Sequence, residues 1–166
     1  MAAAERHRRN TYRAATTDAV IAAAGSAMFF VISGSSTRRN LRVRKIRVSG
    51  DTLTTLAVGS IVVEKWSTAP TGGTATALTA VPLDSTSPAA SPGLVQAYTV
   101  APTEGTLVGT IAANRHVWKS ATVVDAPFSD VDFQFGSLDD VSDVFLHGTA
   151  EALSLAFGAA PAAAVT

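Results

Sequence analysis

The sequence predicts an all-β protein: an antiparallel β-sandwich, jelly-roll-like or immunoglobulin-like, with an extended N-terminal arm. Two observations support this prediction. About eight to ten short segments rich in β-branched and aromatic residues recur roughly every ten residues, separated by turns rich in Gly, Pro, Ser and Thr. No window of the sequence shows the apolar periodicity of an amphipathic helix.

The 166 residues divide into three predicted parts. Residues 1–18 form the arm, because they are polar and basic and Tyr12 is their only large apolar side chain after Met1. Residues 19–157 form the sandwich domain, which is long enough to bury about 70% of the surface that its unfolded chain exposes. Residues 158–166 form a tail rich in alanine.

The strands of the first half are runs of β-forming residues bounded by turns. Ala27–Ser33 is one such run. Leu41–Ser49 alternates until its apolar residues change phase, so we predict a β-bulge near Arg44 and Lys45. Ser60–Ser67 carries apolar residues on both faces, so one face is expected to meet a second sheet and the other a partner.

The second half contains three stronger predictions. Leu94–Val100 and Thr106–Ala112 are joined by a tight connection, which predicts a hairpin. Val131–Phe135 alternates, with its three large apolar residues facing inward. Val144–His147 and Ala152–Phe157 are expected to make a last strand pair. Further strands are predicted at Thr52–Val58, Ala77–Val81 and His116–Val124.

The charges are few and unevenly placed. Charged residues make up 16% of the chain, against about 25% in an average protein, which favours a surface partly covered by partners. Residues 1–50 carry ten basic and two acidic side chains, whereas residues 51–166 carry three basic and eleven acidic ones. The net charges of +8 and −8 cancel, so the chain contains a complementary partner for its own basic segment.

Arginine side chains suit the recognition of carboxylates, because the guanidinium group donates in a fork that matches two oxygens. We therefore expect the basic segment to bind carboxylates on neighbouring subunits. Nucleic acid is a less favoured partner, because the body of the chain is acidic. The candidate partner-binding residues are Arg6, Arg8, Arg9, Tyr12, Arg13, Arg38 and Arg39.

No constellation of residues for catalysis or metal binding stands out, so we expect neither an enzyme nor a cofactor. His7, His116 and His147 lack the spacing of metal ligands, and the last two are interpreted as solvated residues at strand ends. There is no cysteine and no Gly-x-Ser-x-Gly motif. A cluster of acids is interpreted as surface charge, with a calcium site as the alternative; it comprises Asp125, Asp130, Asp132, Asp139, Asp140 and Asp143.

Residues 19–32 are largely apolar, but the run is shorter than the roughly 20 residues of a membrane span. We expect a protein made in the cytoplasm, without export and without a membrane.

The central segments carry a resemblance to a known class of protein. Residues 60–84 read SIVVEKWSTAPTGGTATALTAVPLD, and residues 92–111 read PGLVQAYTVAPTEGTLVGTI. These turn-and-strand patterns resemble the small all-β virion proteins of tailed bacteriophages, of the capsid cement or decoration type. The resemblance implies a β-sandwich at the capsid surface, bound to the major capsid protein or other virion subunits as a trimer or dimer. It implies no catalytic residue.

Two alternatives stay open. The first is a tail or fibre-attachment protein of the same virion class. The second is a carbohydrate-binding sandwich that uses Trp66, Tyr98 or Trp118 as a platform, although such aromatic residues more often pack in a core or an interface.

Overall fold

The computed structural model describes residues 10–16, 28–52, 57–91, 94–120, 130–136 and 143–158, and these residues form thirteen β-strands and no helix. The predicted all-β fold is therefore confirmed. The strands are β1 (Tyr12–Arg13), β2 (Met28–Ser33), β3 (Ser36–Val43), β4 (Lys45–Ser49), β5 (Asp51–Thr52), β6 (Ala57–Thr68), β7 (Thr74–Leu78), β8 (Val81–Pro82), β9 (Val95–Val100), β10 (Thr106–Ser120), β11 (Asp130–Gln134), β12 (Val144–Gly148) and β13 (Ala152–Phe157). No helix long and apolar enough to cross a membrane occurs in this part of the chain.

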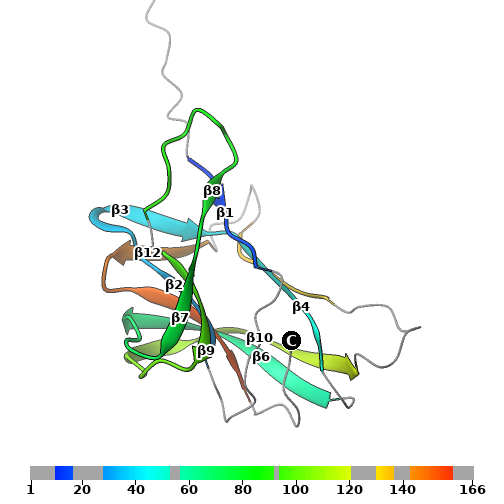
Figure 1. The fold of residues 1–166 in the computed structure, drawn as a ribbon. Helices are drawn as coiled ribbons and strands as arrows, with labels where there is room; N and C mark the ends of the chain where they lie inside the picture. The colour runs from blue at the N-terminus through cyan, green and yellow to red at the C-terminus, as the bar shows by residue number, and fades with distance from the viewer. Residues whose placement is uncertain are drawn as a thin grey trace, which may run out of the picture.

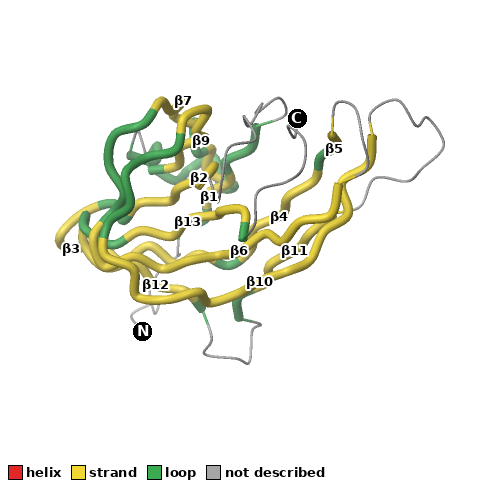
Figure 2. Tube along the Cα trace, turned by 90° about the horizontal axis from the view of Figure 1, so that it is seen from below, coloured by secondary structure: helices red, strands yellow, loops and turns green. Residues whose placement is uncertain are grey.

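The larger layer of the sandwich is a seven-stranded sheet in the order β5-β10-β6-β13-β2-β9-β7 (Figure 1). All its neighbours are antiparallel except β5, which pairs in parallel with the end of β10. The central strand β13 is fully buried, as expected for a strand with neighbours on both sides and side chains packed on both faces. Figure 2 shows the strands joined by loops, with no helix.

The second layer is built on one long stretch of chain that changes partner at Arg44. β3 pairs with β12 up to Val43, and β4 pairs with β11 from Lys45 onward. Val43 and Ile46 are both buried, whereas Arg44 between the two strands is exposed. The apolar residues change phase near Arg44 as the sequence indicates, but the structure has a break between two strands there in place of the predicted β-bulge.

The main core lies between the two layers. The large sheet contributes Phe29, Ile61, Val63, Leu153, Leu155 and Phe157. The second layer contributes Val43, Ile46, Val131, Phe133, Phe135 and Leu146. Val131, Phe133 and Phe135 are all buried, which confirms the predicted inward alternation of residues 131–135. Burial of apolar surface stabilises a fold by ~25 cal/mol per Å². This cluster is the larger of the two, so we expect it to contribute most of that stabilisation.

A smaller apolar cluster covers the opposite face of the large sheet. It consists of Met28, Val31, Trp66, Tyr98, Ala152 and Ala156. Strand β6 therefore buries apolar residues on both faces, as its sequence predicts. The second face, however, is packed by residues of the same chain, with Trp66 only 2% exposed.

The predicted hairpin between β9 and β10 is wrong. β9 pairs with β2 and β7, whereas β10 pairs with β6, and three strands separate them in the sheet. The connection from β9 to β10 runs beside the connection from β6 to β7, and the two are joined by a backbone bridge between Thr71 and Thr103. The long register of β10 with β6 outweighs the local preference for a hairpin.

The predicted last pair is also wrong in its pairing. β12 and β13 are strands, but β12 joins β3 in the second layer and β13 joins β2 and β6 in the large sheet. The turn between them crosses from one layer to the other. There the Glu151 carboxylate accepts a hydrogen bond from the His147 amide at 3.0 Å and lies 3.4 Å from Lys65 Nζ.

The described part of the predicted N-terminal arm is not a free extension. Tyr12–Arg13 forms the short strand β1, which pairs with β8 in a separate two-stranded sheet. At the top of Figure 1, β1 lies beside β8, and the loop after β8 arches above them. Residues 1–9, 17–27 and 159–166 lie outside the described residues, which leaves most of the arm and the tail untested.

Candidate subunit interface

The small sheet of β1 and β8 contains two of the predicted partner-binding residues. The Tyr12 hydroxyl donates to the carbonyl of Pro88 at 2.9 Å, and the Leu83 amide donates to the carbonyl of Thr11 at 2.8 Å. The Arg13 side chain is exposed. Tyr12 thus fixes the segment to the loop after β8, while Arg13 remains accessible to a partner.

The other predicted residues do not join these two in the described structure. Arg38 and Arg39 lie in β3, which belongs to a different sheet from β1. Arg6, Arg8 and Arg9 precede the described residues.

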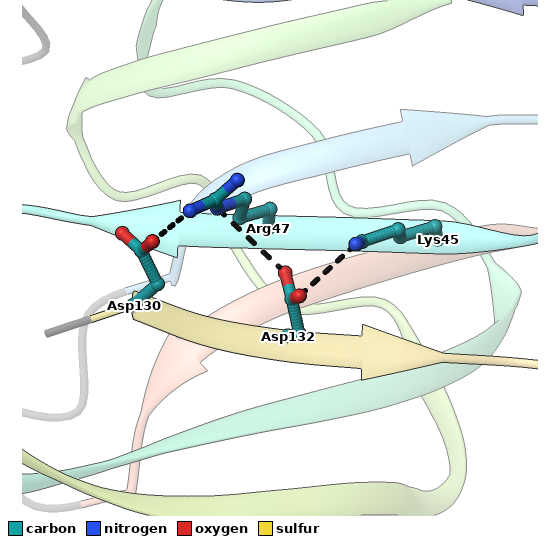
Figure 3. A network of polar contacts seen from close by, with 4 residues as sticks. All are labelled: Lys45, Arg47, Asp130 and Asp132. Carbon is teal, nitrogen blue, oxygen red and sulfur yellow. Dashed lines mark hydrogen bonds and ion pairs between the residues drawn. The ribbon is translucent and has the colours of Figure 1, made fainter.

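The basic side chains of β4, Lys45 and Arg47, are paired with carboxylates of the same chain. Lys45 Nζ lies 3.0 Å from an Asp132 carboxylate oxygen, and Arg47 pairs with Asp130 and lies 3.9 Å from Asp132 (Figure 3). These contacts link β4 to β11 on the exposed face of the second layer. Lys45 and Arg47 thus have carboxylate partners within their own chain, on the neighbouring strand.

A further pair in the same layer is more deeply buried. Arg42 of β3 pairs with Asp143, whose side chain is only 3% exposed. The guanidinium of Arg42 also lies 5.9 Å from the centre of the Phe145 ring, within the range of a cation–π contact. Of the acidic cluster, Asp130, Asp132 and Asp143 thus have basic partners, and no group of three or more potential metal ligands occurs among the described residues.

The interpretation of His116 as a solvated strand-end residue is wrong. β10 runs unbroken through this position, and His116 is 4% exposed, opposite Gly59 of β6. Burial lowers the pKa of His116 below its ordinary value, because the charged imidazolium loses hydration. His147 is exposed, as expected, and its Nδ1 lies 2.9 Å from Asn40 Oδ1.

A buried polar chain crosses the second face of the large sheet. The indole N–H of Trp66 donates to Ser154 Oγ at 2.8 Å, and Ser154 Oγ lies 3.4 Å from Glu64 Oε2. Burial raises the pKa of Glu64, and the nearby Glu104 acts in the same direction. Ser154 is fully buried, so its hydroxyl satisfies the indole and is not presented to a substrate.

The aromatic residues proposed as a sugar platform are mostly inside the protein. Trp66 and Tyr98 are 2% and 5% exposed and belong to the smaller apolar cluster. The Trp118 side chain lies outside the described side chains. Among the described residues, Phe145 of β12 has an exposed ring, which stacks with His147 at a centroid distance of 6.3 Å.

Two exposed apolar regions were not predicted from the sequence. One is on and after β8, where Val81 and Leu83 are 55% and 65% exposed beside β1. The other lies along β10 itself and comprises Leu107, Val108, Ile111 and Val117. The mistaken hairpin concealed the second region, because it assigned β10 the wrong neighbour in the sheet.

A comparison with protein-family models, curated proteins and solved structures finds no match to this chain.

Proposed function

We propose that this chain is a structural virion protein of the capsid cement type, which binds other protein subunits through its N-terminal segment and the β1–β8 sheet. The observation that carries the proposal is the division of the molecule into a well-packed body and a small attached sheet. Neither β1 nor β8 contributes a residue to either apolar cluster, yet the loop after β8 exposes Leu83. Large exposed apolar side chains grouped in this way are typical of interaction sites.

The charge pattern supports the same role. Within the described residues, Lys45 and Arg47 are occupied by carboxylates of β11, whereas Arg13 is exposed in β1. Arg13 of the N-terminal segment is therefore accessible to an acidic surface of another subunit. The sequence resemblance to phage cement proteins names the kind of assembly.

The carbohydrate-binding alternative is weakened by the burial of Trp66 and Tyr98, because a sugar platform needs an exposed ring face. The tail or fibre-attachment alternative uses the same kind of surface. It differs from the cement role in the number of copies per particle.

The test compares the full chain with a variant that lacks residues 1–18. We expect the truncated protein to unfold at a midpoint close to that of the full chain, because none of the described residues 10–16 belongs to either apolar cluster. We expect it to lose its sedimentation with the particle fraction of the native source. A variant lacking residues 159–166 is the control, and it should still sediment with the particles.

Quantitative mass spectrometry of the same fractions separates the virion roles. A copy number near that of the major shell protein supports the cement role, and a few copies per particle support the tail role. A full chain that stays in the soluble fraction contradicts both. Unfolding of the truncated protein contradicts the assignment of residues 1–18 to the interface.

A further inference from the structure

Strand β7 is an open edge of the large sheet, beside β9 (Figure 1). On one side it pairs with β9 from Thr74 to Leu78. On its other side no strand among the described residues pairs with it. The side chains from Thr74 to Ala77 are exposed, so a second strand can reach this edge. The outward backbone N–H and C=O groups of β7 are therefore available to another strand.

This edge carries little of the protection that exposed strands usually have. Native edges are commonly guarded by lysine or other charges, by proline, or by being short. The sequence of β7 contains no charged residue and no proline, and neither does the rest of the stretch from Thr71 to Val81. Its length of five residues is the protective feature that it does have. We therefore expect a strand bound at this edge to be held weakly.

Strand β7 is itself regular, so a register on its open side can be counted residue by residue. The register of β7 with β9 shifts once, between Thr74 and Ala75. The partner residue moves there from Val100 to Tyr98, so the extra residue is Thr99 of β9. The bulge therefore belongs to β9 and leaves β7 continuous.

We infer that β7 pairs antiparallel with β7 of a second copy of this chain, about a two-fold axis at Thr76. In that register Thr76 lies opposite its own counterpart, and Ala75 of one copy lies opposite Ala77 of the other. Thr74 lies opposite Leu78. The strand is thus complementary to itself, as a two-fold interface requires. A two-fold axis can pass through a hydrogen-bonded or a non-hydrogen-bonded pair, so the register does not depend on which backbone groups of Thr76 point outward.

The two ends of this contact add apolar surface. Val100 of β9 is 59% exposed and lies opposite Thr74. The register places Leu78 of the second copy on the other side of Thr74, in the same row across the sheet. Two apolar side chains then flank Thr74, once at each end of the contact.

The absence of charge favours a second copy over the basic N-terminal segment as the occupant. Neither β7 nor its neighbour β9 carries a charged side chain, so two copies can approach without like-charge repulsion between these strands. A basic segment would find no carboxylate on β7 or β9 to pair with.

This pairing goes beyond the proposed cement role, and its test needs no particle. Specific interfaces usually bury more than about 1,000 Å², and two five-residue strands are short for that, so the dimer should be weak. The first measurement is therefore sedimentation equilibrium of the full chain at concentrations up to roughly 1 mM, where weak association is detected. We expect a monomer–dimer equilibrium.

A lysine on the axis should oppose the pairing. We expect Thr76→Lys to weaken the dimer by about tenfold or more, because two lysines then face each other on an open edge. Thr110→Lys is the matched control, since it places the same charge on an exposed threonine of β10, far from β7 in the order of the sheet. The control should leave the equilibrium unchanged.

The absence of cysteine allows a second test, of the register itself. Opposite residues of antiparallel strands have Cα atoms about 4.5–5.5 Å apart, a distance that a disulfide can span. Thr76→Cys should therefore form a covalent homodimer on mild oxidation. Thr74→Cys alone should not, because the two copies of this residue are four positions apart, roughly 13 Å along the strands. A mixture of Thr74→Cys and Leu78→Cys chains should cross-link.

A wild-type chain that stays monomeric at roughly 1 mM would overturn the pairing. Equal effects of the two lysine variants, or equal cross-linking of Thr76→Cys and Thr74→Cys, would overturn it as well. A peptide of residues 1–18 that blocks the cross-linking of Thr76→Cys would overturn the choice of occupant and assign the edge to the N-terminal segment. The particle assay of the proposed function uses no variant of β7, so failure of the pairing and failure of the proposed function can be told apart.

Discussion

Ser154 lies at the centre of the large sheet and provides the acceptor for the indole N–H of Trp66. Replacing it with alanine leaves that N–H buried without its partner, which costs about 1–3 kcal/mol. We expect Ser154→Ala to lower the free energy of unfolding in urea by this amount. Ser67→Ala, which removes an exposed serine hydroxyl of β6, should change the free energy of unfolding by less than about 0.5 kcal/mol. Equal losses in the two variants would contradict this role for Ser154.

His116 makes the stability of the protein depend on pH. Its folded pKa is lowered below the ordinary value of 6.5, so between these two values the unfolded chain binds more protons than the folded chain. Stability is therefore complete above about pH 6.5 and falls as the pH decreases toward the folded pKa. Urea unfolding at a series of pH values should show this slope.

The matched variants for this prediction are His116→Gln and His147→Gln. The first removes the buried imidazole and should flatten the slope below pH 6.5, whatever its effect on stability at pH 7.5. The second removes an exposed imidazole and is the control for the change from histidine to glutamine. A slope that His116→Gln leaves unchanged would assign the pH dependence to another group.

Phe133 and His116 are both buried, but the sequence predicts the burial of Phe133 only. Phe133 is predicted to be buried because strict alternation in a short strand defines two faces without knowledge of its neighbours. The burial of His116 depends on its position opposite Gly59, which is far away in the sequence. No local pattern contains that register, so the histidine is misinterpreted as solvated.

At the scale of an element, β11 is held by its apolar face and not by its charged face. Phe133 belongs to the main core, and its replacement by alanine should cost about 3–5 kcal/mol, from lost burial and the cavity that remains. Asp132 pairs with Lys45 and Arg47, but all three side chains are substantially exposed. Asp132→Asn should therefore cost no more than about 1 kcal/mol.

Chemical denaturation of the two single variants tests this difference, since both residues are on the same short strand. A large loss in Asp132→Asn would mean that the contacts in Figure 3 hold β4 to β11 more strongly than exposed ion pairs usually do. In that case raising the salt concentration should remove most of the loss.

Strand positions are predicted better than strand partners. The segments that became β2, β4, β9, β11 and β13 are visible as runs of β-forming residues between turns. The partner of β10 is not visible, because a five-residue connection is compatible both with a hairpin and with a crossing to a distant strand. Tyr12 and Arg13 lie outside both apolar clusters, as the sequence predicts for the N-terminal segment.

At the scale of the whole molecule, the segregation of charge along the sequence becomes a contact between strands. Basic β4 lies beside acidic β11, so part of the complementarity between the two halves of the chain is satisfied inside the second layer. Sequence alone shows that the halves are complementary, but it does not show whether they meet within one chain or between chains. The pairing of distant strands decides this for β4 and β11.

The order of the large sheet depends on two connections that cross the end of the sheet together, and glycine permits their close approach. A Cβ atom at Gly105 would lie 1.9 Å from the carbonyl oxygen of Thr68, where no real Cβ can lie, so Gly105→Ala must displace one connection. Gly72, in the other connection, has a φ of 75° and open space around it, so Gly72→Ala carries only the left-handed penalty of about 1 kcal/mol. We expect thermal unfolding to show a clearly larger loss for Gly105→Ala, because the backbone of two crossing segments has to move. Equal losses would mean that the crossing is loose and that the register of β10 with β6 alone fixes the strand order.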